Sequence, residues 1–173
     1  MKTVLFFVCA FFIVILLGAC SGNPTANEQS TVAEKKEEAA EEKTSNTTLD
    51  IINDYIKLKD ALVASNAKQA QQVAVALLEV IDAIQMPEMQ QNIKEIAATE
   101  DLTLQRTYFD SLSMEVYQMA KTAETDIPAL YRQFCPMAFD NRGAYWLSFH
   151  KEIRNPYFGD QMLTCGRVEE EIK

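Results

Sequence analysis

The stretch DLTLQRTYFDSLSMEVYQMAKTAE, residues 101–124, decides the fold. Its apolar residues return at steps of three, four or seven positions, the spacing that places side chains on one face of an α-helix. The residues of this stripe are Leu102, Phe109, Leu112, Val116, Met119 and Ala123. The stretch therefore predicts a long helix with one face buried in a core.

Three shorter stretches before it have the same periodicity. Residues 49–65 follow Thr48 and residues 67–85 follow Asn66, both good N-cap residues, and Pro87 suits the first turn of a third helix. Helices with short connections lie antiparallel to their neighbours. The predicted buried residues are Ile52, Tyr55, Ile56, Leu62 and Val63, then Val73, Leu77, Val80, Ile81 and Ile84, then Met89, Ile93 and Ile96, with Met114 and Met119 as gap-fillers. We therefore expect a mainly α fold, an up-and-down four-helix bundle.

The helical period stops after Pro128. ALYRQFC and GAYWLSF, residues 129–135 and 143–149, have the composition of short strands, and the DNRG between them is typical of a turn. RNPYFGDQM, residues 154–162, contains the Asn-Pro and Gly-Asp pairs of an ordered loop. The sequence thus predicts a small C-terminal β-hairpin and an ordered loop packed on the bundle.

The N-terminus has the pattern of an export signal. Lys2 precedes VLFFVCAFFIVILL, an apolar run shorter than the roughly 20 residues that cross a bilayer. LGAC, ending at Cys20, resembles the lipobox of bacterial lipoproteins, which implies a signal peptide over residues 1–19 and a lipid-modified Cys20. Residues 20–48 lack large hydrophobic side chains, so we expect a disordered tether. The protein is then held by lipid on a membrane, the outer membrane, and faces the periplasm.

Composition limits the remaining choices. A chain of 173 residues with 48% apolar content buries one sizeable core, so residues 49–173 form one domain. A net charge of -9 and a pI near 4.7, without a basic stripe, exclude nucleic acid as a partner. The chain has one histidine, and it has neither a nucleophile motif nor a phosphate loop, so we do not expect an enzyme.

Four motifs of the C-terminal segment carry a family resemblance: YRQFCPMAF, GAYWLS, IRNPYFG and MLTCG. Together with YIKLKDALVASNAKQAQQVA upstream, they resemble an uncharacterised family of bacterial lipoproteins and secreted proteins over residues 49–173. A similar domain also occurs at the end of some periplasmic adaptors of copper and silver efflux pumps. The resemblance therefore implies copper handling, with a heavy-metal efflux adaptor or a copper chaperone as partner.

The late sulfur residues permit two interpretations. Cys135 with Met137 and Met162 with Cys165 offer thiolate and thioether ligands, which select Cu(I) or Ag(I), and His150 is a further candidate ligand. Alternatively, Cys135 and Cys165 form a disulfide, because they are the two cysteines left after signal cleavage and lipidation of Cys20. The protein would then be a disulfide-stapled envelope interaction module without metal. The spacing of these residues in the sequence does not decide between the metal site and the disulfide. The family resemblance favours the metal site.

Overall fold

The computed structural model describes residues 47–82, 84, 86–123 and 127–172. The predicted signal peptide (residues 1–19), Cys20 and all but the last two residues of the tether (residues 20–48) lie outside these residues. Export, lipidation and the membrane anchor therefore stay predictions. Within the described part of the chain, none of the helices combines the length and the hydropathy needed to cross a membrane.

Four long helices form the larger part of the residues that the structure describes. They are residues 47–63, α2 (Ala67–Ile81), α3 (Pro87–Ala97) and α4 (Leu102–Thr122). The predicted helix-start residues are confirmed for α2 and α3. Asn66 Oδ1 accepts a 3.0 Å hydrogen bond from the Gln69 N–H, and Pro87 occupies the first turn of α3. Thr48 is not an N-cap, because the helix already includes residue 47.

The buried face of each helix agrees with its apolar stripe, with shifts at the edges. On α2 the fully covered positions are Ala70, Ala74, Leu77 and Ile81, whereas Val73 and Val80 are half-buried at the margin of the stripe. The small alanines were not predicted as core, although they let the neighbouring helices approach closely. Met114, predicted as a gap-filler, is exposed on α4.

A three-stranded antiparallel sheet follows the helices. The predicted hairpin is confirmed as β1 (Leu130–Cys135) and β2 (Ala144–Ser148), joined through the short α5 turn (Ala138–Asn141). A third strand that the sequence did not indicate, β3 (Arg167–Ile172), pairs with the other edge of β1, so the order is β2-β1-β3. The ordered loop between β2 and β3 contains one 3-10 turn, η1 (Gly159–Gln161).

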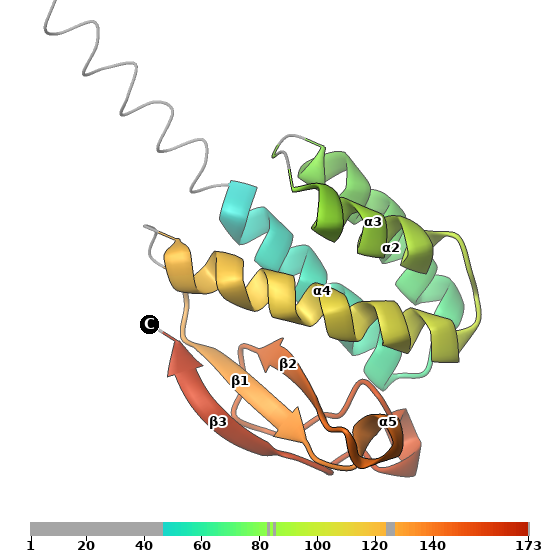
Figure 1. Cartoon of the computed structure of the whole chain (residues 1–173), viewed down its shortest axis with the longest axis vertical. Coiled ribbons are helices and arrows are strands. Elements are labelled where there is room, and N and C mark those ends of the chain that lie inside the picture. The colour runs from blue at the N-terminus through green and yellow to red at the C-terminus, as the bar shows by residue number, and fades with distance from the viewer. Residues whose placement is uncertain (1–46, 83, 85, 124–126, 173) are drawn as a thin grey trace, which may run out of the picture.

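The sheet lies against α4, with α2 and α3 on the opposite side of that helix (Figure 1). A buried hydroxyl of the first helix joins the layers, because Tyr55 Oη accepts a 3.0 Å hydrogen bond from the Leu147 N–H of β2. The same oxygen is 2.8 Å from Ser113 Oγ, which donates to the Phe109 carbonyl. This chain of bonds satisfies an edge group of β2 and fixes the sheet on the bundle.

Candidate functional site

The sheet brings the two late cysteines together. Cys135 is the last residue of β1, and Cys165 comes two residues before β3 begins. Because β1 and β3 are antiparallel, with Phe134 opposite Arg167, the end of one strand lies beside the start of the other. Both residues are free thiols, and their Sγ atoms are 2.9 Å apart. A disulfide bond is about 2.05 Å long, so a small side-chain movement is enough to form one.

The two thiols differ in exposure. Cys135 is fully buried, whereas Cys165 is half-buried. Gly166 shows how tightly the segment after Cys165 is packed, because a Cβ atom there would lie 2.9 Å from both the Phe134 carbonyl oxygen and Trp146 Cη2. Its φ of +147° also lies in the region that favours glycine. The indole of Trp146 thus covers the backbone next to Cys165.

Asn155 anchors the loop that carries Cys165, and sequence reasoning gave it no role beyond a motif position. Its Nδ2 donates a 2.8 Å hydrogen bond to the Cys165 carbonyl, and its Oδ1 accepts from the Tyr157 and Phe158 N–H groups. Its own N–H donates to the Leu163 carbonyl at 2.8 Å. The buried side chain and backbone of Asn155 thus fix the loop over residues 155–165. The Asn-Pro pair was the available signal, but it indicated only a turn.

A second buried amide holds the start of the same loop. Gln133 Nε2 lies within hydrogen-bond distance of three successive carbonyls, those of His150, Lys151 and Glu152, at 2.8, 3.3 and 3.1 Å. Gln133 and Cys135 are two residues apart on β1 and therefore lie on the same face of the sheet. The loop is thus held against the face that carries the buried thiol.

The close contact between the thiols changes their acidity. The hydrogen bond with Cys135, followed by burial, raises the pKa of Cys165 to about 11. The backbone N–H of Met137 donates to the Cys165 sulfur and lowers this pKa by a smaller amount. Cys165 is therefore a protonated thiol at neutral pH, and any metal ion that binds it has to displace a proton.

The two methionines lie near the thiols along the chain. Met137 follows Cys135 by two residues, is 48% exposed and contacts Cys165 through its backbone. Met162 is half-buried, and its carbonyl accepts a 3.1 Å hydrogen bond from the Cys165 N–H. Both predicted sulfur pairs thus meet in one region, at the end of β1.

His150 is not brought to this region. It follows Ser148, which is paired with Tyr131, four residues before Cys135 on β1. At about 3.3 Å per residue, the strand separates these ends by roughly 13 Å. The imidazole is on an exposed residue at the far end of the sheet from the thiols. Among the residues that the structure describes, no group of three or more His, Cys, Asp or Glu side chains is placed to hold a metal ion.

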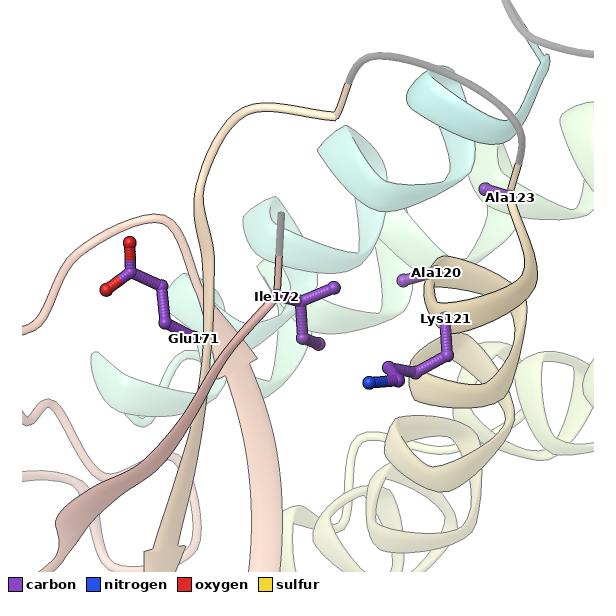
Figure 2. Close-up of a pocket in the computed structure, with 5 residues that line it drawn as sticks. All are labelled: Ala120, Lys121, Ala123, Glu171 and Ile172. Atoms are coloured by element: carbon purple, nitrogen blue, oxygen red, sulfur yellow. The ribbon is translucent and has the colours of Figure 1, made fainter.

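One pocket lies away from the sulfur residues, between the end of α4 and the end of β3. Its volume is about 380 Å³. Figure 2 shows the residues that line it, Ala120, Lys121, Ala123, Glu171 and Ile172. Lys121 is held by Glu170 at 2.8 Å, and Glu171 lies 3.6 Å from Lys151. Because Cys165 precedes the opposite end of β3, this pocket is separate from the thiol pair.

One comparison with known proteins finds a match in the helical part of the chain. Residues 51–127 match the model of a family described as a protein of unknown function (DUF3347). The match covers most of the first helix and all of α2 to α4, and it ends before β1. No curated protein and no solved structure matches the chain. The thiol pair therefore lies outside the matched segment, and its chemistry has to be argued from its own geometry.

Proposed function

We propose that this protein binds a soft monovalent metal ion, Cu(I) or Ag(I), through Cys135 and Cys165 and contributes to copper handling or efflux. Lipid on Cys20 anchors it to the outer membrane, with the domain facing the periplasm, and the ion passes to or from a heavy-metal efflux adaptor or a copper chaperone. The observation that supports this function is the meeting of two free thiols, 30 residues apart in sequence, at 2.9 Å.

The chemistry of the site favours a soft ion. Thiolate and thioether sulfur select Cu(I) and related ions, whereas Ca²⁺ and Mg²⁺ need several oxygen ligands. Metal–sulfur bonds of about 2.3 Å on either side of an ion require the sulfurs to be roughly 4 to 5 Å apart. Because Cys165 is half-buried and Cys135 is fully buried, the proposal assigns this outward movement to Cys165. Met137 and Met162 supply weaker thioether ligands.

Competition against a Cu(I) chelator under reducing conditions tests the proposal. The Cys135→Ser, Cys165→Ser double variant removes both thiolates at nearly constant volume, so we expect at least a ~100-fold loss of affinity. The Met137→Leu, Met162→Leu double variant removes only thioethers, so we expect a loss of several-fold. Equal copper retention by the wild-type protein and the cysteine variant contradicts the metal site.

A second candidate function follows from the same pair. The separation of 2.9 Å and the raised pKa of Cys165 also suit a disulfide that closes the C-terminal region, in an interaction module that docks on an envelope partner without metal. Such a bond across about 30 residues stabilises a domain by about 3 to 4 kcal/mol. Protein isolated without reductant distinguishes the two functions: this candidate expects a full disulfide whose reduction lowers the melting temperature and leaves no copper affinity.

A further inference from the structure

The sulfur atoms of the proposed ion site differ in their access to solvent. Met137 is 48% exposed, Cys165 is half-buried and Cys135 is fully buried. Of these three residues, Met137 is therefore the most accessible to an ion that approaches from outside. Exposure thus decreases from Met137 through Cys165 to Cys135.

Met137 is also tied to the thiol pair through its backbone. Its N–H donates to the Cys165 sulfur, so Cys165 Sγ is in contact with the backbone of Met137 as well as with Cys135 Sγ. Met114, which is exposed on α4, has no such connection to the sheet in the described part of the chain. Met137 therefore combines an exposed side chain with a backbone bond to the thiol pair.

A fixed turn presents Met137. The next residues, Ala138–Asn141, form the α5 turn, in which Phe139, Asp140 and Asn141 have φ values of +49°, +55° and +68°. This conformation is costly for residues other than glycine and persists only where the surroundings hold it. Here Phe139 packs edge-on against Tyr157 at 5.3 Å between ring centroids.

Arg142 completes the attachment of this turn to the bundle. Its guanidinium lies 4.8 Å from the Phe139 ring centre and 2.6 Å from Asp110 of α4. The turn is therefore anchored to both the loop and the helices, and it carries Met137 at a fixed place on the surface.

We infer that Met137 is the receiving ligand of the Cys135–Cys165 site, which takes the ion from a partner that carries it on soft sulfur or imidazole ligands. This inference rests on the proposed function. A weak thioether bond suits this step, because it forms at the surface without loss of a proton and breaks again easily.

The transfer is an exchange of ligands without a change of oxidation state. The ion first bonds to Met137 Sδ and loses one ligand of the partner. Cys165 then gives its proton to water and bonds through the thiolate, which releases a second ligand of the partner. Cys135 loses its proton and bonds last, and Met137 remains only as a weak thioether ligand. One monovalent ion enters and two protons leave to water, so the filled site carries one more negative charge than the empty site.

Stopped-flow transfer of Cu(I) from a coloured chelator complex to the reduced, full-length protein tests this inference. Met137→Leu should slow transfer at least ~10-fold while changing the equilibrium affinity less than ~3-fold, because a receiving ligand acts on the rate more than on the bound state. The matched control is Met114→Leu, an exposed methionine on α4, which should transfer at the wild-type rate.

The possible results separate the inference from the function. If Met137→Leu binds copper as fast as the wild-type protein, the inference is wrong and the thiol site stands. A parallel fall of rate and affinity also overturns it, because Met137 is then an ordinary ligand of the bound state. If the wild-type protein takes no copper from the chelator, the proposed function fails and the inference fails with it.

Discussion

The helical bundle and the C-terminal sheet with its loop are held together by different forces. The bundle core consists of apolar side chains such as Leu77, Ile93 and Phe109, each fully buried at a helical spacing. The loop beside the sheet depends on buried amides, Asn155 and Gln133, which bind backbone groups far apart in the sequence. A periodic apolar core gives a stable scaffold, whereas directional hydrogen bonds place two thiols within contact.

The largest effect is expected in the bundle. Leu77→Asp places a charge in the fully buried stripe of α2 without a partner, and should lower the free energy of unfolding by about 4 kcal/mol or more. Val75→Asp on the same helix is the matched control, because Val75 is 49% exposed and should change stability by less than about 0.5 kcal/mol. Urea denaturation followed by circular dichroism measures both variants. Similar stability of the two variants shows that the stripe is assigned wrongly.

The next effect separates the two regions. Asn155→Asp keeps the shape and the acceptor oxygens but replaces the donor to the Cys165 carbonyl, so we expect a loss of about 2 to 3 kcal/mol. Ion affinity should fall at least ~10-fold while the helical signal below the unfolding transition is unchanged, because the bundle does not use this bond. Asn141→Asp is the control, since Asn141 is exposed and aspartate also tolerates its positive φ. Wild-type copper affinity in Asn155→Asp refutes the role of the loop.

These two regions also differ in what the sequence could predict. Apolar periodicity, Asn66 and Pro87 located the helices because local spacing alone decides which helical face is buried. The strand β3 was missed because its three consecutive glutamates are poor strand formers. This strand is held by residues distant in sequence. It pairs with β1, and Glu170 accepts hydrogen bonds from Lys121 and Tyr117.

The residues of the candidate site could be predicted from the sequence, but their arrangement in space could not. Cys135 and Cys165 were predicted as partners of each other in either interpretation, yet only the β1–β3 pairing explains why their sulfurs meet. His150 was a reasonable ligand by residue type, but strand register places it beyond the opposite end of β1. Long-range pairing of this kind leaves no local pattern, so spacing could not decide it.

A smaller effect concerns the protons of the thiol pair. Since the pKa of Cys165 is raised to about 11, its thiol is protonated at neutral pH and an ion has to displace that proton. Because two protons leave when one ion binds to the thiol pair, affinity for Cu(I) should fall about 100-fold for each unit of decrease in pH between about pH 8 and pH 6, or about 2.7 kcal/mol per unit. Competition titrations with a pH-insensitive chelator measure this slope. If the Cys165→Ser variant has the same pH dependence of affinity as the wild-type protein, the displaced protons come from other groups.

The smallest effect is expected where the two regions meet at the surface. Lys121 of α4 contacts Glu170 of β3 at 2.8 Å, and both side chains are partly exposed. Solvent and salt screen such a pair, so Lys121→Gln should leave the melting temperature and the copper affinity unchanged within error. Differential scanning calorimetry at low and high salt checks this expectation. A clear loss of stability at low salt means that surface charge, and not only the Tyr55 hydroxyl, holds the sheet on the bundle.

The most direct test is the copper content of protein isolated from the envelope without added reductant, measured by elemental mass spectrometry together with a count of free thiols. A soft-metal site predicts about one copper per chain in cells supplied with copper, and none in the Cys135→Ser, Cys165→Ser variant. The bound copper should be lost when the pair is oxidised, because a disulfide has no thiolate to offer. Wild-type protein with no copper and no free thiols at Cys135 and Cys165 contradicts the metal site and favours the disulfide-stapled module.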